Sequence, residues 1–138
     1  MKDCIFCKIA AGEIPSATLY EDEKVRVILD LSPAAPGHAL VLPKRHYKDV
    51  RTMPGTLLGH GMKIAARIGA AQMAALDYQG FNLVQNNGAS AGQSVFHFHL
   101  HVIPRREGDA VLPLWQPGTS TEQERETVCS RIRAVLEE

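Results

Sequence analysis

The chain has 138 residues, of which 45% are hydrophobic and 22% charged, and its formal net charge is zero because Lys+Arg and Asp+Glu both number 15. The length suits a single domain, and the neutral balance gives no general attraction to nucleic acid polymers or to membranes. No apolar run has the length of a membrane span and no apolar segment follows the first charged residues, so we expect a cytoplasmic protein without a secretory signal.

The first half of the chain predicts a short helix followed by three strands. Residues 4–10 are typical of a turn or short helix, and residues 17–21 and 25–29 are typical of strands. A loop rich in proline and other turn residues covers 30–37, and residues 38–43 form the third predicted strand.

The second half predicts a long helix, two further strands and a terminal helix. Apolar residues recur at helical spacing between Pro54 and Gly80, with the proline near the start and the glycine just past the end, as helix ends prefer. The other predicted elements are a strand at 81–85, a polar loop at 86–94, a strand at 95–103 ended by Pro104, and a helix at 121–138 capped by Ser120 or Thr121. This order predicts an α+β fold with a mostly antiparallel five-stranded sheet, one long helix and a C-terminal helix.

Three histidines alternate with apolar residues in the last predicted strand. Because side chains alternate between the faces of a strand, His97, His99 and His101 should point one way, roughly 6–7 Å apart, while Phe98 and Leu100 point into the core. Such a set suits either a metal site or acid–base and nucleophilic chemistry. The loop at 86–94 favours the second, because its small residues, hydroxyls and amides expose donors that suit phosphate oxygens.

The stretch His97-Phe98-His99-Leu100-His101-Val102-Ile103 resembles the signature of the histidine triad (HIT) family. The resemblance extends over residues 4–46, including Pro36-Gly37-His38, and over residues 81–105. It implies a single HIT domain over 1–138, with a core at about 4–106 and a C-terminal tail and helix at 107–138.

In this family the middle histidine attacks the α-phosphorus of a nucleoside phosphate, which implies His99 as the nucleophile and a nucleotidyl-histidine intermediate that water hydrolyses. The resemblance thus implies a nucleotide hydrolase or transferase that cleaves a nucleoside 5′-phosphoramidate or related adenylate, with a purine nucleotide as substrate and no organic cofactor. The alternatives are a dinucleoside polyphosphate hydrolase and a nucleotide-binding interaction module with little turnover.

The resemblance also implies roles for residues around His99. His101, Ser94 and Gln93 would donate to phosphate oxygens, and His38 would orient the triad and balance protons. The residues expected to contact the nucleotide are Asp30 at the ribose, Asn86 and Gly92 near the ribose and phosphate, and Ile28 and Leu31 at the base.

Cys4 and Cys7 have the spacing of a zinc knuckle, but two cysteines need two more ligands to complete a tetrahedral site. The resemblance supplies His46 and His97, and the set implies a structural zinc ion that leaves His99 free. A metal-free thiol pair or a redox pair are the alternatives. Cys129 lies on the terminal helix, where we expect a small buried or half-buried side chain.

The resemblance is weaker after the triad. Pro104-Arg105-Arg106 stands where phosphoramidate-cleaving members usually continue with two glycines and an arginine, and the tail around Trp115 has no firm equivalent. The family implies a homodimer through the long helix and a sheet edge. Small residues on that helix are compatible with close approach of a partner; they are Gly59, Gly61, Ala65, Ala66 and Gly69. His60, on the same helix, belongs to no motif and is expected to be a surface residue.

Overall fold

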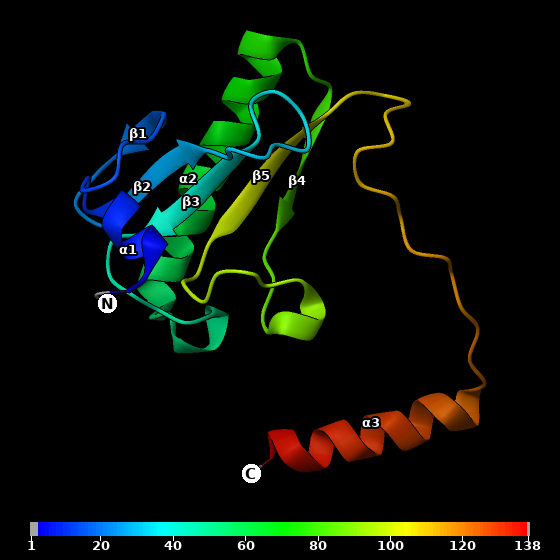
Figure 1. Cartoon of the computed structure of the whole chain (residues 1–138). Coiled ribbons are helices and arrows are strands. Elements are labelled where there is room, and N and C mark those ends of the chain that lie inside the picture. The colour runs from blue at the N-terminus through cyan, green and yellow to red at the C-terminus, as the bar shows by residue number, and fades with distance from the viewer. Residues whose placement is uncertain (1–2, 138) are drawn as a thin grey trace.

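The computed structural model describes residues 3–137 and contains a five-stranded antiparallel sheet with the order β1-β2-β3-β5-β4 (Figure 1). This confirms the predicted α+β fold. Within residues 3–137, no helix has the length and apolarity required to cross a membrane. The elements are α1 (Ile5–Ala10), β1 (Thr18–Glu21), β2 (Val25–Leu29), β3 (Ala39–Pro43), α2 (Gly55–Leu76), β4 (Gly80–Val84), β5 (Leu100–Arg105) and α3 (Glu122–Leu136), with short 3-10 turns at Val50–Thr52 and Ala89–Ala91.

The two faces of the sheet are covered by different helices. One face packs against α2 and carries the larger core cluster, which includes Val27, Val41 and Leu100. The other face is covered by α1 over β2 and β3, through a smaller cluster that includes Leu40 and Leu42. All five residues of β3 are buried because both of its faces are covered.

The side of α2 that faces the sheet is built from small residues. Gly61, Ala65 and Gly69 are buried there, and a Cβ atom at Gly69 would lie 2.5 Å from the Phe81 ring. The helix ends at Leu76, earlier than predicted, because Asp77 takes the left-handed conformation (φ 58°) that we had expected of Gly80. Ala65 and Gly69, two of the five small residues, therefore pack against the chain's own sheet.

The strand predicted at 95–103 is wrong at both ends. It begins at Leu100, because residues before it form bends and the Phe98 N–H donates to the Tyr47 carbonyl (2.6 Å) rather than to a strand. It also continues through Pro104. The paired residues of β3 reach only from Leu100 to Val102 of β5, so at Pro104 the strand has one neighbour and the missing N–H costs no bond to β3.

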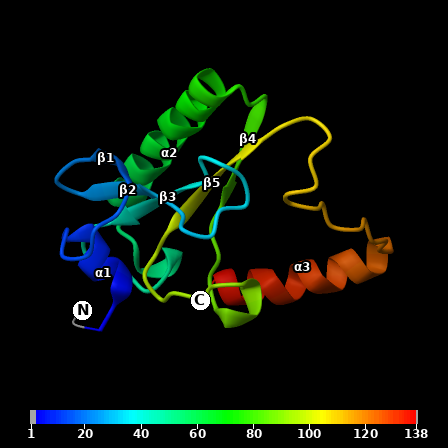
Figure 2. The same cartoon turned by 45° about the horizontal axis from the view of Figure 1, so that its top comes forward.

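The C-terminal helix forms as predicted, with Thr121 as its N-cap accepting from the Glu124 N–H (3.1 Å). Figures 1 and 2 show the segment before it running away from the sheet in an extended form. No described residue of α3 is buried, and Val128, Ile132 and Val135 are each more than half exposed. Cys129 is exposed, so the expectation that it packs inside is wrong.

Candidate active site

The three histidines of the motif lie together although only His101 belongs to β5. The alternation of side chains holds, because Phe98, Leu100 and Val102 all enter the core against α2. His97 and His99 are 0% and 7% exposed, and the ring centres of His99 and His101 are 5.0 Å apart. The rings of His97 and His99 are therefore nearly shielded from water, His101 is half-buried, and the rings of His99 and His101 lie closer than strand spacing alone predicts.

The hydrogen bonding of His99 fixes which ring nitrogen is free. Its Nδ1 lies 2.8 Å from the main-chain carbonyl of His97. A carbonyl only accepts, so Nδ1 of a neutral His99 must carry the proton and donate. The Nε2 atom then keeps its lone pair, which is the state a nucleophile requires. Phe6 of α1 contacts the same ring edge-on, with ring centres 5.0 Å apart.

A chain of hydrogen bonds sets the tautomer of His101. The Ala34 N–H donates to Nδ1 of His38 (3.0 Å), so the proton of a neutral His38 is on Nε2. That Nε2 lies 2.9 Å from Nδ1 of His101 and donates to it. His101 consequently carries its own proton on Nε2, where it can be donated to a ligand.

Burial keeps both of these histidines neutral. The pKa of His101 is lowered to about 4, first by burial and then by the positive charges that His99 and His38 would carry, against the raising effect of Asp30. Burial also lowers the pKa of His38, again opposed by the nearby Asp30 carboxylate. At neutral pH each ring therefore holds one proton, as the hydrogen-bond chain requires.

The loop before the triad is organised mainly by Gln93. Its side chain is buried, its Oε1 accepts from the Gly88 N–H (2.8 Å), and its Nε2 donates to the carbonyls of Lys48 and Val95 (2.7 and 3.1 Å). The amide of Gln93 is thus occupied by the main chain. Ser94 is exposed at the end of this loop, and its hydroxyl is available as a donor.

Glycine is required at the turns of the same loop. Gly88 and Gly92 have φ values of 93° and 95°, which L side chains rarely adopt. A Cβ atom at Gly92 would lie 3.5 Å from Nδ2 of Asn86, so these two residues, both expected near the phosphate, are neighbours.

The residues expected around the ribose and base lie at different depths. Asp30 accepts the Ser32 N–H on Oδ1 (2.8 Å), and its Oδ2 is 3.6 Å from Nε2 of His38, which places the carboxylate beside the histidine chain. Ile28 is buried in the cluster under α1, whereas Leu31 is 97% exposed.

The four expected metal ligands also converge. The ligand atoms of Cys4, Cys7, His46 and His97 all lie within 4.8 Å of one another, and the three sulfur-to-nitrogen distances Cys4–His97, Cys7–His46 and Cys7–His97 are 3.4–3.5 Å. Zinc bonds of about 2.3 Å to sulfur and 2.0–2.1 Å to nitrogen at the tetrahedral angle give a sulfur-to-nitrogen distance of about 3.5 Å. Nε2 of His97 donates to the Pro43 carbonyl (2.8 Å), which turns the unprotonated Nδ1 toward the sulfurs. The donor set and its spacing fit tetrahedral zinc.

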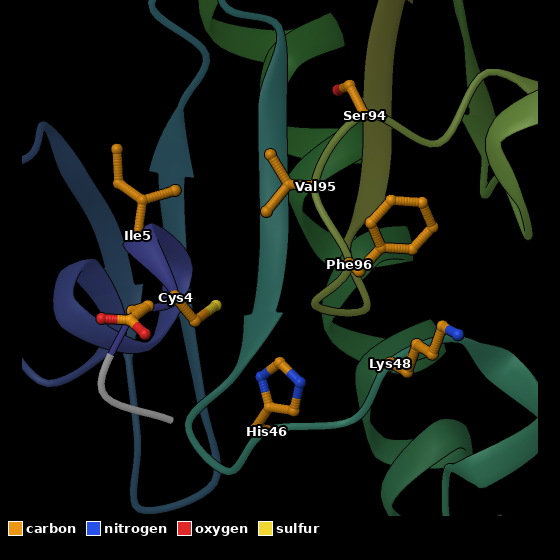
Figure 3. Close-up of a pocket in the computed structure, with 8 residues that line it drawn as sticks. Cys4, Ile5, His46, Lys48, Ser94, Val95 and Phe96 are labelled. Carbon is orange, nitrogen blue, oxygen red and sulfur yellow. The ribbon is translucent and has the colours of Figure 1, made fainter.

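A cavity of about 740 Å³ borders both this cluster and the loop (Figure 3). Figure 3 shows Cys4 and Ile5 on one side of it and Ser94 and Phe96 on another, with His46 between the two segments. The metal-binding cluster and the end of the predicted phosphate loop are therefore adjacent.

Two contacts, one within the site and one outside it, were not predicted from the sequence. Phe6 lies against His99, and its only local signal was an apolar residue between the two cysteines. His60 is half-buried rather than fully on the surface, and its Nε2 lies 2.7 Å from Oδ2 of Asp22, which also accepts from the Tyr20 hydroxyl (2.8 Å). That cluster ties α2 to the turn after β1.

The fold and the histidine triad define the class of protein, and comparison with known families gives the same answer. The family model of the HIT domain matches residues 11–108. The chain belongs to the HIT family.

Curated relatives cover most of this chain. Protein hit of Bacillus subtilis is 44% identical over 116 residues, which are 83% of this chain and 80% of that protein. Adenosine 5′-monophosphoramidase HNT1 of Saccharomyces cerevisiae is 40% identical over 86% of this chain and 73% of its own length. Adenylylsulfatase HINT3 of Arabidopsis thaliana is 43% identical over 79% of this chain but only 55% of its own length.

Solved structures share the fold, including the C-terminal region. A HIT family protein from Bacillus anthracis superposes with a TM-score of 0.86 and 38% identity, covering 96% of both chains. A zinc-bound histidine triad family protein from Mycobacterium smegmatis superposes with a TM-score of 0.77 and 33% identity, covering 97% of this chain and 98% of the other.

Proposed function

We propose that this protein is a nucleotide hydrolase or transferase that cleaves a nucleoside 5′-phosphoramidate or a related adenylate through a nucleotidyl-histidine intermediate on His99. The observation that carries the proposal is the hydrogen bond from Nδ1 of His99 to the His97 carbonyl, which leaves Nε2 of this buried side chain as a free nucleophile.

The reaction takes place in two steps. Nε2 of His99 forms a bond to the α-phosphorus as the bond to the leaving group breaks, and water then cleaves the phosphorus–nitrogen bond to release the nucleoside monophosphate. Nε2–H of His101 donates to a phosphate oxygen, and the exposed Ser94 hydroxyl is a second donor. His38 holds His101 in that tautomer. When His101 gives its Nε2 proton to the leaving group, the Nε2 proton of His38 can move to Nδ1 of His101.

The relatives support this class of substrate. One is named an adenosine 5′-monophosphoramidase and another an adenylylsulfatase, and both names describe an adenylate that carries a leaving group other than a second nucleotide. For the nucleotide itself we propose that Asp30 binds the ribose hydroxyls, that Asn86 and Gly92 border the ribose and phosphate, and that Ile28 and Leu31 border the base. Gln93 would act by shaping the loop, since its amide bonds the main chain.

The test compares AMP release from an adenosine phosphoramidate, adenylyl sulfate and a diadenosine polyphosphate. We expect the first two to be cleaved faster, and we expect His99→Ala to abolish release while the matched His60→Ala variant, outside the site, retains it. Preference for the diadenosine compound would favour the alternative hydrolase. Binding of AMP without release from any substrate would indicate a nucleotide-binding module instead.

We also propose that Cys4, Cys7, His46 and His97 hold one structural zinc ion. The support is the fit of their spacing to a tetrahedral site and the zinc-bound relative from Mycobacterium smegmatis. Metal analysis of the purified protein should find about one zinc per chain, and Cys7→Ser should lose it whereas Cys129→Ser should not. Equal zinc content in both variants would contradict the assignment.

We propose further that the chain forms a homodimer. Two surfaces support it: β4 is an edge strand whose residues are all partly exposed, and α3 presents Val128, Ile132 and Val135 to solvent. A 15-residue helix without packing is marginal in water. Light scattering should give the mass of two chains, and Ile132→Asp should reduce it more than Ser130→Asp on the same helix. A monomeric wild-type protein would refute the proposal.

A further inference from the structure

We propose that Phe6 and the Cys4-Cys7-His46-His97 cluster position the nucleophile, so that metal binding at the N-terminal segment sets the orientation of the His99 ring. The inference rests on the proposed function of His99 and on the fit of the cluster to zinc. It gives Phe6, Cys4, Cys7 and His46 a role in turnover although none of them needs to touch the substrate.

The first connection runs through His97. The Nδ1 atom of this residue lies 3.5 and 3.4 Å from the sulfurs of Cys4 and Cys7, and its Nε2 donates to the Pro43 carbonyl. Both ring nitrogens are thus held, and the side chain is fully buried. The main-chain carbonyl of this same residue accepts the proton on Nδ1 of His99 (2.8 Å). A group that fixes the His97 side chain therefore also fixes the acceptor that orients His99.

The backbone around His97 and His99 makes their hydrogen bond dependent on contacts outside the strand. His97 and His99 precede β5, so the ladder of the sheet does not hold them. Within this stretch the bond from the Phe98 N–H to the Tyr47 carbonyl ties the chain to the residue after His46. The support of His99 is therefore assembled from the segment that carries the cluster and from the end of β3, where Pro43 accepts from His97, rather than from pairing between strands.

The second connection runs through α1. Cys4 caps this six-residue helix, its sulfur accepting the Cys7 N–H (3.4 Å), and Phe6 lies between the two cysteines. The Phe6 ring meets His99 edge-on at 5.0 Å and His97 at 6.1 Å. A helix this short does not hold its shape alone. The two cysteines at its first turn fix the position of Phe6 when they are bound to a common ion.

Two variants and a control separate positioning from folding. Phe6→Leu keeps all four ligands and an apolar side chain but removes the ring against His99, whereas Cys7→Ser removes a ligand. Cys129→Ser removes an exposed thiol far along the chain and serves as the control. We expect Phe6→Leu to retain one zinc per chain and to lose at least about tenfold in kcat with KM within about twofold of wild type. Wild-type kcat in Phe6→Leu would overturn the role of the ring.

A second measurement needs no turnover. In the wild-type protein treated with a chelator, and again after addition of Zn²⁺ alone, NMR of the imidazole groups reads the Hδ1 proton of His99, which is protected when it donates to His97. We expect that signal with zinc, its loss without zinc, and its return on addition, while the methyl signals of the core against α2 stay in place. An unchanged His99 signal in the zinc-free, folded protein would overturn the proposal. If the wild-type chain cleaves no nucleotide, the proposed function fails, but this measurement still decides the coupling.

Discussion

Replacing His38 tests whether the hydrogen-bond chain behind His101 contributes to turnover. His38→Ala removes the donor to Nδ1 of His101 and the acceptor for the Ala34 N–H, two bonds of 2.9 and 3.0 Å. A buried group that loses its partner costs about 1–3 kcal/mol, and here His101 also loses the contact that selects its tautomer. If about 1.4–2.7 kcal/mol of this appears in the transition state, kcat/KM falls by about 10- to 100-fold.

A conservative variant separates catalysis from loop stability. The Oδ1 of asparagine lies about where imidazole Nδ1 does, so His38→Asn should still accept from Ala34, but its amide is too short to reach His101. We expect His38→Asn to restore the thermal stability that His38→Ala loses and to restore little of the rate of AMP release. A His38→Ala enzyme within about twofold of wild type, or full recovery of rate in His38→Asn, would refute the reasoning.

Three further predictions concern stability. In urea denaturation Gly69→Ala should lower the free energy of unfolding by about 1 kcal/mol, because the new Cβ would lie 2.5 Å from the Phe81 ring. Gly59→Ala, where a Cβ has open space, should raise it by about 0.5–1 kcal/mol. Effects of the same sign would contradict this reasoning. The free energy of unfolding should fall as the pH is lowered from about 6.5 to 4, because in this range the unfolded chain protonates His101, whose pKa in the folded chain is about 4. His101→Asn should make this fall smaller. An identical slope in the variant would exclude His101 as its source. Asp22→Asn, which disturbs the acceptor of two side chains and two main-chain N–H groups, should lower the melting temperature by several degrees in a thermal scan, and an unchanged value would show that these bonds contribute little.

The sheet and its helices were largely predictable because their signals are local. Short apolar runs bounded by turn residues located all five strands, helical spacing located α2, and capping residues indicated α3. The errors arose where a distant contact outweighs the local pattern. Residues 95–99 alternate as a strand does, but the bond from Phe98 to Tyr47 joins segments 51 positions apart, and no local pattern signals it. Asp77 ended α2 where only glycine was expected.

The candidate site was predictable in its residue types but not in its connections. The alternation around His99 indicated which side chains lie together, and the cysteine spacing indicated a metal site. The tautomers of His99 and His101 depend on a main-chain carbonyl and on a histidine 63 positions away, which only the folded chain brings into contact. The role of Gln93 was not predictable from its residue type. A polar residue in this loop was expected to donate to phosphate, but its side chain bonds the main chain of the loop and of Lys48.

The pairing of β3 with β5 has a consequence for how variation in the core can affect chemistry. Leu40 lies opposite His101 in this pair, and His38 stands two residues before Leu40. Residues along a strand are about 3.3 Å apart, so a slip of two positions in the direction that carries His38 away from His101 would keep every apolar side chain on its own face yet add about 6.6 Å to their offset along the strands. A chain with that shift would have the same composition of strands and a normal core but no hydrogen bond between the two histidines. Substitutions at buried positions of β3 and β5, remote from any ligand, can therefore reduce activity by changing the alignment of these two strands.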